Sequence, residues 1–311
     1  MAAAVVTSIV VVSKGNDTPA AAPASPVPTV TVKDVAAAKE ATPTGPTVYF
    51  SAKLSGAEEV PTPGGPASGS PVGTGTALVA VAGDRVIFQL GWDGISAPTM
   101  GHIHEGASGV NGPVVVPLFG TAMPATVDAA AGAIDLTDAG LADRLRKNPG
   151  SFYVNLHTTE FPGGALRGQL APAAGDQHDM LAFGWNAQLK SQNNGANEVP
   201  DPAGPKSGDP DGRADSSVKF VDDTLDYSFT WTGIAEPTMG HVHWGPAGQN
   251  GEVRVPLFGS AVPENIFAVS GSVSGLDDSL LKSIKAKPET FYTNLHTAEF
   301  PGGAVRGQLQ R

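Results

Sequence analysis

Short apolar stretches alternate with Gly- and Pro-rich punctuation along most of the chain after residue 46. The stretch TALVAVAGDRVIFQLGW predicts two strands around an Ala-Gly-Asp turn, and SSVKFVDDTLDYSFTW alternates in period two around Asp222–Asp223. GHIHEG predicts a short strand that is followed by a Gly-rich loop and by PVVVPLFG, while FYVNLHT and ALRGQL flank TEFPGG as a further hairpin. This pattern is typical of a mostly antiparallel β protein.

One helical segment interrupts the strands. LTDAGLADRLRKNPG has Thr or Asp as the N-cap, apolar residues at helical spacing, basic residues in the last turn and Pro-Gly after it. LDDSLLKSIKAKPE shows the same features further along the chain. We therefore expect one short helix in each of two similar units.

The two units are copies in a fixed frame. PTMGHIHEGASG at Pro98 recurs as PTMGHVHWGPAG at Pro237, and FYVNLHTTEFPGGALRGQL at Phe152 recurs as FYTNLHTAEFPGGAVRGQL at Phe291, each 139 residues later. Glu-Val-Pro at Glu59 and Val-Pro-Leu-Phe-Gly at Val116 recur at the same offset. This is a duplicated domain rather than a short-period solenoid. We predict two tandem antiparallel β-sandwiches of immunoglobulin-like architecture at 47–172 and 181–311, joined by a linker at 173–180.

The first 46 residues differ in composition from the rest. MAAAVVTSIVVVSKG has an apolar run of signal-peptide length without a preceding Lys or Arg, and an Ala/Pro/Thr-rich stretch follows it. The segment 1–46 is therefore either the remnant of a signal or a β-prone extension, followed by an extended linker. We expect a secreted, cell-surface or periplasmic protein with no membrane span in its mature domains.

Composition excludes several classes of function. The 311 residues carry a formal net charge of -11, which argues against a nucleic-acid partner, and they include no cysteine. Disulfides, thiolate metal sites and cysteine nucleophiles are thereby excluded. No Ser-His-Asp arrangement, phosphate-binding Gly loop or paired catalytic carboxylates is evident, so hydrolase and nucleotide chemistry are not expected.

Six of the seven histidines belong to the duplicated pattern, whereas His178 stands alone in the predicted linker. Residues i and i+2 of a strand share one face, so the two histidines of each His-x-His can converge on one ion. The histidine of Asn-Leu-His-Thr supplies a third imidazole, a set that suits copper or zinc and leaves a fourth position open. We predict one ion in each domain, held by His102, His104 and His157, and by His241, His243 and His296. The alternative is a hydrogen-bonded histidine cluster that locks loops together.

Other repeated side chains surround this pattern. Met100 and Met239 could add a thioether ligand, although packing in the core is the favoured role, and Asn155 and Asn294 lie on the strand face of the third histidine. Two pairs of charged residues flank the Pro-Gly-Gly turn; their acids could orient an imidazole, but we expect ion pairs between Glu160 and Arg167 and between Glu299 and Arg306. The aromatic residues expected in the core are Trp92, Trp231, Phe119 and Phe258.

At these motifs the sequence resembles the CHRD domain family, named for the extracellular antagonist chordin. The resemblance covers both predicted domains and implies extracytoplasmic β-sandwich modules; protein binding is a property that the fold alone does not transfer. A His-x-His on a β-sandwich is also similar to the copper site of copper–zinc superoxide dismutases. The chain lacks the fourth copper histidine, the bridging histidine with its zinc partners, and the disulfide cysteines of that family.

Three functions follow from the sequence. The favoured one is an extracytoplasmic protein that binds copper, or else zinc, for sequestration, delivery or display, with an affinity that falls as pH drops through about 6–6.5. The second is a structural or adhesive surface module that self-assembles, or binds a protein partner, through strand edges and VVTSIVVV. The third is a copper-dependent oxidoreductase of superoxide-dismutase type. The sequence favours a binding protein over an enzyme.

Overall fold

A computed structural model describes residues 9–10, 47–173, 180–182 and 186–311 of the chain. Most of the predicted N-terminal segment 1–46 and most of the predicted linker 173–180 lie outside these residues. The described part of the first segment, Ile9–Val10 (β1), pairs in parallel with Met180–Ala182 (β11).

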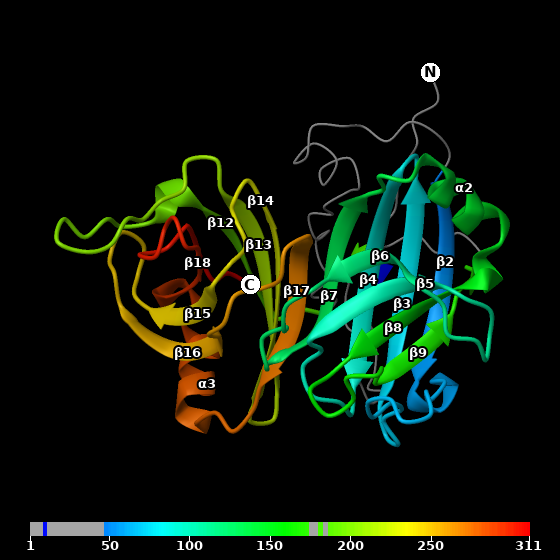
Figure 1. Cartoon of the computed structure of the whole chain (residues 1–311). Coiled ribbons are helices and arrows are strands. Elements are labelled where there is room, and N and C mark those ends of the chain that lie inside the picture. Colours follow the sequence, from blue (N-terminus) through cyan, green and yellow to red (C-terminus); the bar gives the residue numbers. More distant parts are fainter. Residues whose placement is uncertain (1–8, 11–46, 174–179, 183–185) are drawn as a thin grey trace.

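The described residues fold into two β-sandwich domains that repeat the same order of elements (Figure 1). In domain 1 these elements are β2 (Thr47–Ser55), η1 (Gly56–Glu58), β3 (Thr74–Ala82), β4 (Arg85–Asp93), β5 (Met100–Glu105), β6 (Val114–Phe119), β7 (Val127–Asp135), α2 (Ala139–Lys147), η2 (Pro149–Ser151), β8 (Phe152–His157), β9 (Leu166–Gln169) and β10 (Ala171–Pro172).

In domain 2 they are β12 (Leu189–Asn194), η3 (Gly195–Asn197), β13 (Arg213–Val221), β14 (Thr224–Thr232), β15 (Met239–Trp244), β16 (Glu252–Phe258), β17 (Ile266–Val273), α3 (Asp278–Ala286), η4 (Pro288–Thr290), β18 (Phe291–His296) and β19 (Val305–Gln308).

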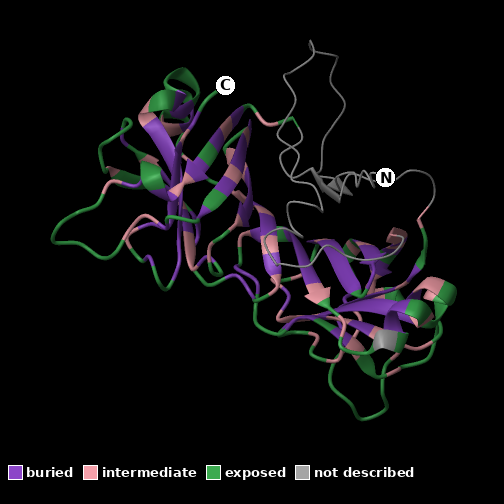
Figure 2. Ribbon diagram, turned by 90° about the horizontal axis from the view of Figure 1, so that it is seen from above, coloured by how far each residue is buried: buried purple, intermediate pink, exposed green. Residues whose placement is uncertain are grey.

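Each domain has two antiparallel layers. In domain 1 the order β2-β3-β4-β7 forms one layer and β6-β5-β8-β9 forms the other. Apolar side chains at alternate strand positions fill the space between the layers, and Figure 2 shows the strands largely buried and many connecting loops exposed. Trp92, Trp231, Phe119 and Phe258 are buried core residues, as predicted. A fully buried aromatic side chain of this kind contributes roughly 1.5–3 kcal/mol to stability.

The predicted turns and helices form where the sequence placed them. Gly83 adopts a φ of 58° between β3 and β4, and Asp222 adopts a φ of 51° between β13 and β14. Both values lie in the left-handed region that glycine and aspartate tolerate best. Asp138 caps α2 by accepting a hydrogen bond from the Gly140 amide, and Asp277 caps α3 in the same way. A 3-10 turn that starts with proline follows each helix.

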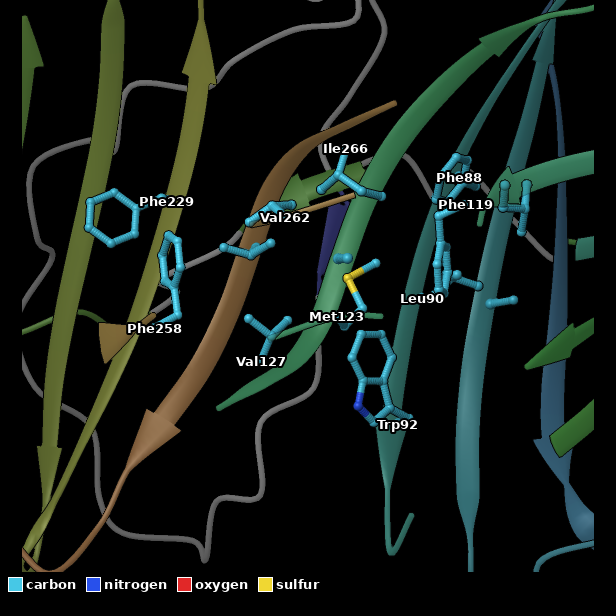
Figure 3. Close-up of a cluster of buried hydrophobic side chains, with 14 of the residues drawn as sticks. Phe88, Leu90, Trp92, Phe119, Met123, Val127, Phe229, Phe258, Val262 and Ile266 are labelled. Atoms are coloured by element: carbon cyan, nitrogen blue, oxygen red, sulfur yellow. The ribbon is translucent and has the colours of Figure 1, made fainter. Parts of the chain in front are cut away.

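The two domains share a continuous sheet, which the sequence did not predict. Strand β7 pairs in antiparallel fashion with β17, so the four-stranded layer of domain 1 continues into domain 2. Figure 3 shows Met123 and Val127 of domain 1 close to Val262 and Ile266 of domain 2. All four side chains belong to one buried cluster that spans both domains.

Candidate metal centre

The three predicted histidines of each domain lie together on the outer face of the β5–β8 or β15–β18 strand pair. In domain 1 the register places Met100 opposite His157 and His102 opposite Asn155, so these side chains share one face with His104. One ligand-capable atom from each imidazole lies within 4.8 Å of those of the other two. Domain 2 brings His241, His243 and His296 together in the same way.

Backbone carbonyl groups fix the tautomers of two of these imidazoles. His104 Nδ1 lies 2.9 Å from the carbonyl oxygen of Gly112, and His157 Nδ1 lies 3.0 Å from that of Pro162. A carbonyl only accepts, so in each neutral ring Nδ1 carries the proton and Nε2 keeps a free lone pair. Metal-binding histidines are commonly oriented by this kind of hydrogen bond.

The ligand-capable nitrogens of domain 1 lie close to one another. His104 Nε2 is buried and has no hydrogen-bond partner among the described residues. His157 Nε2 lies within hydrogen-bond distance of His102 Nδ1, at 3.3 Å, and the two rings make a T-shaped contact. A buried nitrogen without a partner is costly unless a ligand satisfies it.

Domain 2 repeats this geometry closely. His243 Nδ1 lies 3.0 Å from the Gly251 carbonyl oxygen, and His296 Nδ1 lies 3.0 Å from that of Pro301. His241 Nδ1 is 3.1 Å from His296 Nε2, and His243 Nε2 is again buried without a partner. In both domains the glycine-rich loop and the Pro-Gly-Gly turn therefore supply the carbonyl groups that orient the imidazoles.

Burial keeps the imidazoles neutral. Burial, together with the smaller effect of the neighbouring imidazoles, lowers the pKa of His102 and of His241 to about 4. Burial also lowers the pKa of the other four histidines of the two sites. The imidazoles therefore stay neutral, the form that can ligate a cation, at a lower pH than an imidazole in water.

A stack of three side chains supports the site. The ring of Tyr153 lies parallel to that of His104, with 4.8 Å between the centroids, and the guanidinium of Arg167 sits 3.5 Å from the Tyr153 centroid. Arg167 also donates to the carbonyl oxygens of Ala107 and Val110, and therefore holds the loop that carries Gly112. Tyr292 and Arg306 form the same stack on His243.

This placement of the arginines corrects the predicted ion pairs. Glu160 accepts a hydrogen bond from Ser96 instead of pairing with Arg167. Glu299 pairs with Lys206 at 2.7 Å instead of pairing with Arg306. The two acids are exposed, whereas the two arginines are each 1% exposed, because the arginines turn inward over the tyrosine rings.

Asn155 has a partner that the sequence analysis missed. Its amide nitrogen donates to Glu59 at 2.8 Å, while its Oδ1 is buried without a partner. Asn294 donates to Glu198 at 2.6 Å in domain 2. Burial raises the pKa of both carboxyl groups to about 7, against hydrogen bonds from the asparagines and the charges of nearby arginines. The repeat of Glu-Val-Pro was the sequence signal for these two acids.

The remaining predicted residues lie beside the histidines. Met100 and Met239 are half-buried and lie in register with His157 and His296, on the outer face rather than in the sandwich core. Gly101 precedes His102 because a Cβ there would overlap the ring of Phe119, which packs directly beneath the strand. The motif Met-Gly-His-x-His therefore combines a close-packed backbone with two outward imidazoles.

Comparison with known proteins identifies one family. The model of the CHRD domain matches residues 50–170 and again residues 189–309, which are the two β-sandwiches. No curated protein matches the sequence. Among the described residues, no helix has the length and apolar character needed to cross a bilayer.

Proposed function

We propose that this chain, which belongs to the CHRD domain family, binds one transition-metal ion in each of its two domains. The observation that carries the proposal is the pair of oriented Nε2 atoms beside a third imidazole, one of them buried without a partner. A hydrogen-bonded histidine cluster without a metal would not leave that nitrogen unsatisfied.

Copper is the favoured ion. Three neutral imidazoles suit copper or zinc better than calcium or magnesium, which take oxygen ligands. Copper(II) also binds nitrogen sites more tightly than zinc(II) in the general order of divalent metals. Three protein ligands leave a coordination position open for water or a small ligand.

The role that fits this site is sequestration, delivery or display of copper outside the cytoplasm. Modules of this family are of an extracellular type, which supports a location where metal is taken up or exchanged. Imidazoles that stay neutral when the surroundings turn mildly acidic would keep such a site competent there.

Elemental analysis of protein purified without a polyhistidine tag tests the proposal. We expect about two copper ions per chain, about one in His157→Ala and none in the double variant His157→Ala/His296→Ala. His178→Ala, in the predicted linker, is the control and should keep both ions. Unchanged metal content in the double variant would refute the site, and zinc at the same stoichiometry would correct the metal.

A further inference from the structure

Strand β7 of domain 1 and strand β17 of domain 2 are equivalent strands of the duplicated domain, and they pair with each other. Ala130 and Val269 occupy equivalent positions, and they pair with each other. The pairs on either side of them follow the same symmetry: the pair Val127–Gly271 becomes the pair Ile266–Gly132 when each residue is replaced by its equivalent in the other domain. The domains are therefore related by a local twofold axis that passes between Ala130 and Val269, as in an isologous dimer.

Each strand has a bulge at one equivalent residue. Register shifts occur between Ile266 and Ala268, and between Ser270 and Gly271, where the facing strand carries Asp128. Phe267 and Asp128 are the two bulge residues, and they occupy the same position in the two copies. A bulge redirects a side chain, and here it lays each one on the outer sheet face of the other domain.

The two faces that receive these side chains differ in polarity. Phe267 packs on the apolar face of domain 1, which includes Ile87, Ala131 and Ala133. The equivalent positions of domain 2 carry Asp226, Ser270 and Ser272. Asp128 accepts a hydrogen bond of 3.3 Å from Ser270, and the single hydroxyl proton of Ser272 is shared between Asp128 at 3.3 Å and Asp226 at 3.0 Å.

Pairing between like domains would mismatch both residues. In a contact between two copies of domain 1, Asp128 would face Ala131 and Ala133, which offer no hydroxyl group. In a contact between two copies of domain 2, Phe267 would cover Ser270 and Ser272. Specificity in proteins commonly comes from such penalties against the wrong partner.

We propose that the β7–β17 surface is a docking site with a built-in choice of partner, in which domain 1 accepts domain 2 and rejects a second domain 1. The partner is domain 2 of a second copy of this chain, which takes the place of the chain's own domain 2. Because the contact is formed by edge strands, two chains that exchange domains would restore it in the same register. Asp128 and Phe267 determine the choice.

The absence of native cysteine allows a direct test with the full chain. Ala130→Cys and Val269→Cys place one thiol each beside the local twofold axis, so a disulfide between two chains reports which domains have paired. Equal amounts of the two single-cysteine proteins are refolded together at high concentration in EDTA, oxidised, and analysed by peptide mass spectrometry. The double variant Ala130→Cys/Val269→Cys, at low concentration, should give an intramolecular bond and shows that both substitutions permit folding.

We expect links between residues 130 and 269 to exceed 130–130 and 269–269 links by about tenfold. Adding Asp128→Phe to Ala130→Cys should raise the 130–130 link by about the same factor, because phenylalanine fits the apolar face of domain 1. The proposed specificity would be overturned if the 130–269, 130–130 and 269–269 links formed in the proportions expected from random pairing. It would also be overturned if Asp128→Phe left the amount of the 130–130 link unchanged. Failure of any two chains to cross-link, while the double variant cross-links internally, would overturn docking of a second copy.

Discussion

The buried carboxyl group of Glu198, close to the histidine cluster of domain 2, makes stability depend on pH in a direction that can be measured. Glu198 is 8% exposed and accepts a hydrogen bond from Asn294, and burial raises its pKa from 4.5 to about 7. The unfolded chain ionises this group near pH 4.5, whereas the folded chain keeps the proton until about pH 7. Over that window the folded state binds more protons at this group, so the contribution of Glu198 to stability falls as pH rises.

The size of the effect follows from the two pKa values. A rise from 4.5 to about 7 corresponds to about 3 kcal/mol of unfolding free energy, present below pH 4.5 and lost by about pH 7. Glu198→Gln keeps the shape and an acceptor for Asn294, but it cannot ionise. We therefore expect the variant to gain about 3 kcal/mol relative to the wild type between pH 4 and pH 8.

Urea unfolding at a series of pH values, in EDTA, measures this difference. Glu59→Gln should behave similarly in domain 1, since the pKa of Glu59 is raised for the same reason. Glu289→Gln, at an exposed position on η4, is the control for adding an amide and removing a surface charge. Parallel stability curves for Glu198→Gln and the wild type would show that the carboxyl is ionised in the folded protein, and would refute the reasoning.

Three further outcomes follow from the structure. Gly164→Ala should cost about 2–4 kcal/mol in urea unfolding, because Gly164 has a φ of 121° and a Cβ there would lie 2.6 Å from both carboxylate oxygens of Glu59. Thr293→Val should cost about 1–3 kcal/mol, because the buried Asn193 Oδ1 loses its donor and Ser191 and Ser216 each lose one hydrogen-bond partner. Most of that loss should be recovered when all four hydrogen-bonded side chains of this buried network are replaced together by the apolar residues found at the equivalent positions of domain 1. That variant is Ser191→Ala/Asn193→Leu/Ser216→Ala/Thr293→Val. His241 acts in the opposite direction to Glu198, because its pKa is lowered to about 4 and the unfolded chain takes up that proton first; in thermal melts in EDTA, His241→Gln should therefore gain stability relative to the wild type as pH drops from 6.5 towards 4.

The features that the sequence predicts correctly are governed by local geometry. The period-two pattern, the turn residues and the helix caps act over a few residues, and the strands and helices formed as expected. The third imidazole was also predictable, because its strand is one member of a short hairpin that repeats intact. Because the two domains match at a constant offset of 139 residues, each prediction made for one domain applied to the equivalent residues of the other.

The features that it misses depend on distant segments. Glu59 meets Asn155 from 96 residues away, so spacing along the chain gives no indication of the contact. The expected pair of Glu160 and Arg167 assumed that both side chains leave the turn on the same side. Arg167 instead turns inward, since its long side chain can cover Tyr153 and reach carbonyl groups of the facing loop.

The backbone origin of the orienting contacts explains which positions differ between the copies. Any residue offers a carbonyl group, so side chains beside the site can change without loss of the histidine tautomers; Glu105 of one domain stands where Trp244 stands in the other. What cannot change is the close approach of the loop to the strand. A Cβ at Gly112 would overlap the carbonyl oxygen of Glu105, and Gly251 meets Trp244 in the same way. The centre therefore depends on glycine at these loop positions as directly as on its histidines.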